Sequence, residues 1–334
     1  MNKFKRLGPG LLFAGAAIGV SHLVYSTRAG ADYGWGLLWA FLIINIFKYP
    51  FFEFGPRYAV ATGETLLDGY KKIGKKYLWF YAILNTANMF TIQAAVTIVT
   101  AGLAAHFFGI SANLAIWGSI IIIICSLLLV IGKYSLLDKL IKFIIIILSF
   151  CTFLALILAF YNSNEFPSLV QVLPQGPGLL FLIAFMGWMP ATMDISIWHS
   201  IWSVEKQKEI KNINLKETLY DFNVGYVTTI LLGLLFMGLG ALVMFNTEEE
   251  FSDKGLVFAS QLIDLYTSNL GESFGGIISL AAFTTMFSTT ITTLDASPRA
   301  FSKTIQLIYK DDKDYYLFFL IILSLGTIGI FLFL

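Results

Sequence analysis

The 334-residue chain is 57% hydrophobic and only 13% charged, and its formal net charge is +1. Soluble domains carry about 25% charged residues, so this composition excludes an ordinary soluble domain and predicts a membrane protein. The sequence lacks the alternating segments of about ten residues that a transmembrane β-barrel needs, so we expect α-helical spans. Two cysteines, Cys125 and Cys151, lie in apolar runs, where packing is their expected role.

Apolar segments long enough to cross the roughly 30 Å hydrocarbon core, which takes about 20 helical residues, recur along the whole chain. Nine such spans are expected, at residues 8–34, 35–61, 77–105, 113–132, 137–162, 178–204, 219–246, 273–295 and 315–334. The first follows basic residues and resembles a signal peptide. Because eight further spans follow it, an uncleaved helix is the better interpretation.

Basic residues collect in alternate connections between the spans. They occur before span one, where Lys3, Lys5 and Arg6 lie, and after spans two, four, six and eight, whereas the loop before span eight is acidic at 248–250. The positive-inside rule then places the N-terminus in the cytoplasm of a multi-pass protein. A bacterial inner membrane is compatible with the short loops. Because topology explains the basic loops, the expected environment is a lipid bilayer, and nucleic acid is not an expected partner.

Spans one and six each contain an interruption. Span one breaks at Gly19–His22, whereas Gly187 and Pro190 interrupt span six, with Asp194 four residues beyond the proline. Within hydrocarbon, a broken helix is tolerated only where it lines a cavity or is buried in protein. Interruptions at corresponding places in two inverted halves mark the central binding site of many secondary transporters. A simple kink is the alternative interpretation of either break taken alone.

Asp194 is the strongest single indication of a site. A carboxylate near the middle of a membrane costs about 2.5–3.5 kcal/mol on insertion scales, so it is expected to pair, protonate or bind a cation. A structural ion pair is the alternative. His22 can exchange a proton near neutral pH, which makes it a candidate for proton coupling, although a hydrogen bond to a neighbouring helix would equally explain it.

Other polar residues within the spans predict structural roles. Glu53 and Arg57 in span two have the i,i+4 spacing of a helical ion pair, and Lys48 is expected near the far interface. Asn85 and Asn88 in span three are expected to hydrogen-bond neighbouring helices.

Several motifs occur in a fixed order along the chain. They are GPGLLFAGAAIGVSHLVYSTRAGADYGWGLLW in span one, TGETL at Thr62–Leu66, Met189-Pro190 and His199-Ser200 in span six, and STTIT at Ser288–Thr292. In this order they resemble motifs of the Nramp family of divalent-metal transporters. That family has a similar first helix, T-G-x-x-L after helix two, MP and HS in helix six, and S-S-T-I-T in helix eight.

The resemblance implies a transporter, not an enzyme, with no bound cofactor. It implies an all-α LeuT-type fold of inverted five-helix repeats with broken helices one and six, within one transmembrane domain. We expect the first repeat at 1–162 and the second at 178–334. Because the chain ends inside span nine, we expect the second repeat to be incomplete and the sequence to be a truncated one.

The chain departs from the family at the residues that bind metal. The family carries D-P-G-N at the first break, and its aspartate and asparagine bind the ion. Counted from GPG without gaps, those positions hold Gly19, Val20, Ser21 and His22. The carboxylate is therefore missing, and a histidine replaces the asparagine.

Helix six of the family reads A-x-x-M-P-H-N…H-S, in which the methionine sulfur and the alanine carbonyl bind metal. Alignment on Met189-Pro190 makes Met189 the sulfur ligand. Alignment on the later His-Ser pair instead puts Thr192 at the methionine position and Asp194 at the histidine position. Both registers remain open from the sequence.

The two registers imply different ions. Met189, His22 and Asp194 would favour a transition metal such as manganese or iron. Asp194, Thr192, Ser21 and main-chain carbonyls would favour a hard, partly hydrated ion such as magnesium. The complete set of candidate binding residues is Gly19, Ser21, His22, Met189, Ala191, Thr192 and Asp194, of which His22 and Asp194 are also candidates for proton coupling.

We therefore expect a secondary active transporter that moves divalent metal cations by alternating access, with protons as candidate co-substrates. The alternative is a transporter of the same fold for another small solute, such as an amino acid or a monovalent cation, because fold does not fix function. A membrane enzyme or an inactive relative is a third interpretation, disfavoured because the spans carry no paired carboxylates. The sequence makes no prediction of the oligomeric state.

Overall fold

The computed structural model describes most of the chain, and every regular element in the described part is a helix. The described residues are 7–109, 113–162, 167–210, 213–245 and 272–333, with isolated positions between 252 and 267. The basic residues Lys3, Lys5 and Arg6 and the acidic run at 248–250, on which the predicted orientation depends, lie outside them.

Span one is broken where the sequence predicted. Helix α1 (Pro9–Ala17) ends just before Gly19, and a π-helical segment, η2 (Ser21–Ser26), leads into α2 (Thr27–Tyr33). The two parts are bent by 53° relative to each other. The interruption is therefore a change of direction within one membrane span.

Span six is also broken, between α7 (Pro177–Trp188) and α8 (Asp194–Glu209). Pro190 explains the position of this break. Proline has no N–H to continue the helical ladder, and it disfavours a helical conformation in the residue before it. Met189 accordingly has an extended backbone.

The other long helices have no such break. They are α3 (Leu38–Thr62), α5 (Lys75–Phe108), α6 (Leu114–Asn162), α9 (Leu215–Leu239) with its π-helical extension η3 (Gly240–Met244), α11 (Glu272–Tyr309) and α12 (Tyr316–Phe333). The short helix α4 (Leu66–Ile73) follows α3.

Length and composition support most of the expected spans. Among the described residues, six helical stretches are long and apolar enough to cross a membrane, and the bent α1–α2 unit makes up to seven. Helix α6 supplies two of them, Leu114–Gly132 and Ser135–Tyr161. Expected spans six and eight correspond to α7–α8 and α11. In the described residues, neither meets both the length and the hydropathy required of a membrane span, and α7 alone has only 12 residues.

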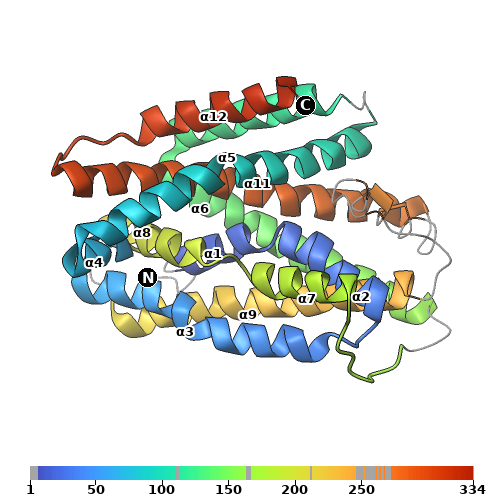
Figure 1. Ribbon diagram of the computed structural model, residues 1–334. Coiled ribbons are helices and arrows are strands. Elements are labelled where there is room, and N and C mark those ends of the chain that lie inside the picture. Colours follow the sequence, from blue (N-terminus) through green and yellow to red (C-terminus); the bar gives the residue numbers. More distant parts are fainter. Residues whose placement is uncertain are drawn as a thin grey trace.

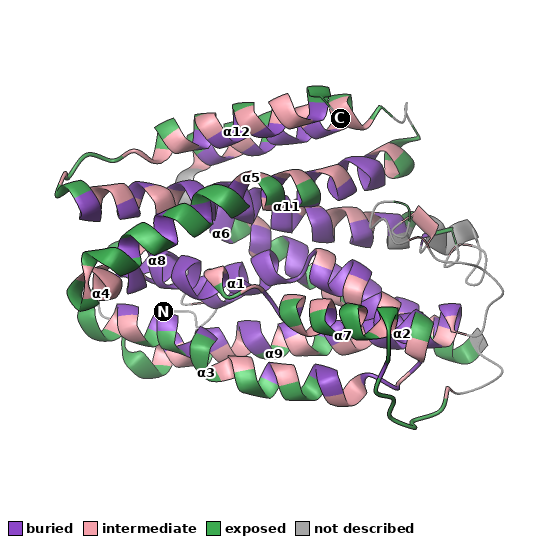
Figure 2. Cartoon of the chain, viewed as in Figure 1, coloured by how far each residue is buried: buried purple, intermediate pink, exposed green. Residues whose placement is uncertain are grey.

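The broken helices pack on unbroken ones. Helix α1 lies against α9, and α8 lies against α3, whereas α5 and α6 contact α11 and α12 covers α6 and α11 (Figure 1). Exposed positions face outward along α3, α5 and α12 (Figure 2). Many are large apolar side chains, including Ile46, which is 70% exposed, and Phe47, which is 68% exposed. So much exposed apolar surface matches a lipid environment and would be costly in water.

Both halves of helix one contact the α9–η3 helix backbone to backbone. A Cβ atom on Gly10 or on Gly225 would lie 2.0 Å or 1.9 Å from a main-chain oxygen of the facing helix. At the other end, a Cβ on Gly30 or on Gly240 would lie 2.0 Å from such an oxygen. Only glycine permits this approach, which is common between membrane helices.

Candidate functional site

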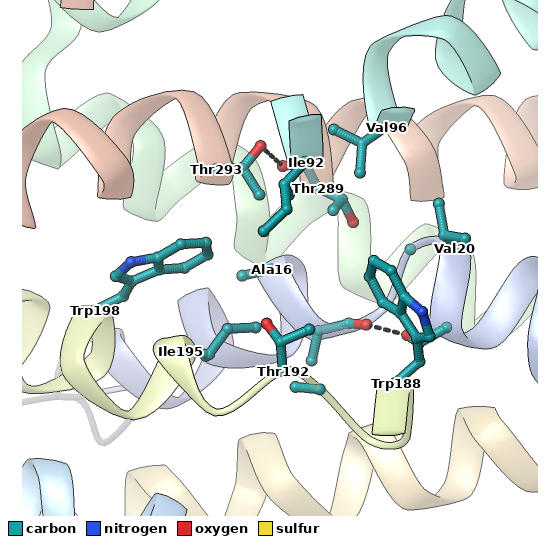
Figure 3. Close-up of a pocket in the computed structure, with 14 residues that line it drawn as sticks. Ala16, Val20, Ile92, Val96, Trp188, Thr192, Ile195, Trp198, Thr289 and Thr293 are labelled. Carbon is teal, nitrogen blue, oxygen red and sulfur yellow. Dashed lines mark hydrogen bonds between the residues drawn. The ribbon is translucent and has the colours of Figure 1, made fainter. Parts of the chain in front are cut away.

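The two breaks face each other across a small cavity that α5 and α11 close from the other side. Figure 3 shows Thr289 and Thr293 on α11, and Trp188, Thr192 and Trp198 around the break in span six. The centres of water-sized spheres can occupy only about 30 Å³ there. That space suits one or two waters or a bare ion and is too small for an organic solute.

Four of the seven candidate residues, Gly19, Ser21, Ala191 and Thr192, line this cavity. The walls are otherwise mainly apolar. No acidic side chain is among the described residues that line it. The cavity by itself therefore offers hydroxyl and main-chain oxygens, but no negative charge for a divalent cation.

Thr289 fills the space beside Gly19, the position at which the gap-free count from GPG puts the aspartate of the family motif. A Cβ atom on Gly19 would lie 2.4 Å from the Thr289 hydroxyl oxygen. That oxygen is 2.9 Å from the carbonyl oxygen of Ile18 and 3.2 Å from that of Gly15, so its O–H can donate to the carbonyls at the end of α1. These are the carbonyls that a helix end leaves without an N–H partner. Thr289 thus satisfies the broken end of the helix.

His22 does not line the cavity, because its imidazole ring points at α9. The ring is fully buried, with Nδ1 2.8 Å from the Ser21 hydroxyl oxygen and Nε2 3.0 Å from the carbonyl oxygen of Thr229. A carbonyl oxygen can only accept, so Nε2 carries the hydrogen of this bond. Both nitrogens face protein atoms, and neither offers a lone pair to a metal in this arrangement.

Met189 is also directed away from the cavity. Its side chain is completely buried in an apolar cluster with Phe41, Leu182, Phe185 and Met237. The thioether therefore contributes to packing between α3, α7 and α9. The structure does not bring Met189, His22 and Asp194 together as one ligand set.

Asp194 opens onto a second and larger pocket, bounded by α3, α4, α5 and α8, in which water-sized spheres have about 560 Å³ available. Asp194 is the first residue of α8, where the helix dipole favours a negative charge. None of the ion pairs in the described part of the chain includes Asp194. The structural ion pair that the sequence left open is therefore not formed in the described part of the chain.

Further polar side chains line the Asp194 pocket, among them residues to which the sequence analysis gave no binding role. Tyr81, Asn85 and Asn88 follow each other at helical spacings along one face of α5, and Met193 precedes Asp194. The amide nitrogen of Asn85 is buried without a hydrogen-bond partner in the described structure. The sequence could have predicted this polar face, because Tyr81, Asn85 and Asn88 have the i, i+4, i+7 spacing of residues on one side of a helix.

Lys48, which was expected near the far interface, reaches the break in span six with its side chain. Its ammonium nitrogen is within hydrogen-bond distance of main-chain oxygens on both sides of Pro190. The ion pair predicted in α3 is confirmed, since Arg57 Nε donates to Glu53 at 2.8 Å.

No group of three His, Cys, Asp or Glu side chains that could hold a metal ion is found in the described part of the chain.

Residues 10–334 match the family described as Natural resistance-associated macrophage protein-like, or Nramp. The chain belongs to the Nramp family. Uncharacterized protein PM0681 of Pasteurella multocida (strain Pm70) is 38% identical to this Nramp-family chain over 323 residues, which are 95% of this chain and 74% of that protein.

Solved transporters share the fold at low sequence identity. A manganese transporter from Eremococcus coleocola, in complex with an aromatic bis-isothiourea substituted compound, superposes with a TM-score of 0.74 at 14% identity, over 99% of this chain and 70% of that one. Mhp1, a nucleobase-cation-symport-1 family transporter, gives a TM-score of 0.72 at 15% identity, over 97% of this chain and 71% of that one.

These findings confirm the predicted family and the all-helical, LeuT-type fold with its broken first helix. The protein is a multi-pass membrane protein of a transporter family and not an enzyme.

Proposed function

We propose that this Nramp-family protein carries a divalent metal cation across the membrane by alternating access, with its N-terminus in the cytoplasm. The observation that carries the proposal is the Asp194 carboxylate, which lies next to the break in span six, lines a pocket and has no ion-pair partner in the described structure. An intramembrane carboxylate of this kind needs a cation or a proton to offset its charge.

The residues around Asp194 supply a ligand set that suits a transition metal. Asn85 and Asn88 offer amide oxygens, and the thioether of Met193 lies in the same pocket. Carboxylate and amide oxygens accept manganese, magnesium and calcium alike, whereas a thioether favours the softer transition metals. The proposal thus assigns metal binding to Asp194 and its pocket, and structural roles to His22 and Met189.

A second candidate is transport of a small organic cation or amino acid, and the size of the Asp194 pocket favours it. About 560 Å³ exceeds what one ion requires, and Phe51, Phe54, Tyr70 and Tyr81 give the pocket aromatic walls. An ammonium group could pair with Asp194 while aromatic faces contact the rest of the solute.

The deciding experiment is uptake into proteoliposomes that contain the purified protein, with manganese, magnesium and calcium compared, and with and without an inward proton gradient. Asp194→Asn should abolish metal uptake while the melting temperature stays near that of the wild type. Asp312→Asn, at an exposed position outside the pocket, is the matched control and should transport normally.

Unchanged metal uptake by a folded Asp194→Asn protein would contradict the proposal. Absence of metal uptake by the wild type, together with Asp194-dependent binding of an organic amine, would favour the second candidate.

A further inference from the structure

The break in span six surrounds the end of one lysine side chain. Lys48 Nζ lies 3.0 Å from the carbonyl oxygen of Met186, 2.6 Å from that of Gly187, 2.8 Å from that of Met189 and 3.2 Å from that of Ala191. We call these four oxygens the carbonyl cage. They come from both sides of the break, so a single cationic group joins α7 to the extended segment that follows it.

The carbonyl cage exists because a helix ends there inside the membrane. The last carbonyls of α7 have no N–H partner one turn further on, since the chain beyond Trp188 is extended and Pro190 has no N–H at all. The C-terminal end of a helix also carries a partial negative charge. Four carbonyl oxygens that point to one place at a helix C-terminus can therefore bind a cation.

The Lys48 ammonium meets this requirement without help from a carboxylate. It has three N–H donors and no acceptor, and none of the ion pairs in the described structure includes it, so no acidic side chain there balances its charge. Main-chain dipoles alone therefore stabilise the ammonium, as they would a bound ion.

We propose that Lys48 is a built-in cation of this transporter: its ammonium occupies the carbonyl cage, holds span six in its broken form and excludes free cations from those oxygens. One consequence concerns Ala191, whose carbonyl was a candidate ligand and is taken by Lys48. Solute binding is thereby directed to the side of the break where Asp194 lies. The inference goes beyond the proposed function and holds whichever solute is carried.

Removal of the lysine should leave a vacant cage that a small cation can fill. Purified Lys48→Ala protein in detergent should melt about 5 °C below the wild type, since four carbonyl oxygens, three of them in part-buried hydrogen bonds, lose their donor. Methylammonium chloride, which restores the missing end of the side chain, should recover most of this loss. Choline chloride at the same concentration should not, because its quaternary head has no N–H donors and is too large.

Two further variants serve as controls. Lys48→Met keeps a long side chain in the cage without donors, so it should be destabilised and should not respond to methylammonium. Lys72→Ala removes a surface lysine that pairs with Glu64, and its melting temperature should be the same in both salts.

A wild-type melting temperature for Lys48→Ala, or an equal deficit in methylammonium and choline, would overturn the proposal. If Lys48→Ala folds only when a cation is supplied, expression and purification in methylammonium give the same comparison, and failure to obtain folded protein there would also overturn it. The measurement needs no transported solute, so its outcome is independent of the test of Asp194.

Discussion

Nε2 of His22 donates a hydrogen bond to the carbonyl oxygen of Thr229 across 3.0 Å, and this bond fastens the break in helix one to α9. Counted from GPG without gaps, the histidine stands at the position of the asparagine in the family motif. In this chain it joins two helices that are 207 residues apart in sequence. In this structure the imidazole takes part in the packing of helix one against α9.

His22→Ala should therefore lower stability, because it removes the hydrogen bond to the buried carbonyl of Thr229 and leaves a cavity where the fully buried ring stood. We expect a loss of about 1–3 kcal/mol in unfolding free energy, seen as a lower melting temperature. His22→Gln, which keeps a donor, should lose less. A His22→Ala protein with wild-type stability but without metal binding would instead show that His22 is a ligand.

Gly19 and Thr289 should behave as a coupled pair. Gly19→Asp, which restores the acidic residue of the family motif, should destabilise the protein because its Cβ would lie 2.4 Å from the Thr289 hydroxyl oxygen. Adding Thr289→Gly removes the clash and opens space for the carboxylate.

The measurement for this pair is a double-mutant cycle on melting temperature and manganese affinity. The coupling energy should favour the double variant by about 0.5–3 kcal/mol, and only the double variant should gain affinity. Additive effects of the two substitutions would contradict the steric explanation.

Asp68 in α4, outside the membrane spans, should make stability depend on acidic pH. Burial alone would raise the pKa of Asp68, but hydrogen bonds from Thr65 and Lys303 outweigh it and hold this pKa below its ordinary value. A lowered folded-state pKa gives stability that is complete above the unfolded value of about 4 and is lost as pH falls through the folded value.

Asp68→Asn should accordingly lower stability by about 1 kcal/mol at neutral pH, and the difference from the wild type should shrink below about pH 4. Thermal unfolding at a series of pH values measures it. A difference that stays constant down to the acidic end would show that ionisation of Asp68 is not the cause.

The breaks were predictable from sequence because their causes are local. A glycine next to small and polar residues, and a proline within an apolar run, interrupt a helix wherever it packs. The hydropathy pattern likewise located most of the spans. The division into repeats at 1–162 and 178–334 and the cytoplasmic N-terminus stay predictions.

The directions of side chains were not predictable, because they depend on how each helix is rotated in the packed structure. Met189 and Asp194 are five residues apart, yet one is packed among apolar residues and the other lines a pocket. Lys48 meets carbonyls 138 to 143 residues away, a pairing that no local pattern indicates. Asn85 and Asn88 were predicted to make helix contacts, because only the folded structure shows that they line the same pocket as Asp194.

The glycine contacts along helix one decide which parts of the protein can move independently. Both halves of this helix touch α9 or η3 through the main chain, so tilting one half alone would open a void that no side chain can fill. The contacts between α1 and α11 instead involve the hydroxyls of Ser288 and Thr289, which change partners by rotation about one bond. We therefore expect a sliding surface between helix one and α11. We expect α1, α2 and α9 to move together on one side of this surface, and α5 and α11 to stay together on the other.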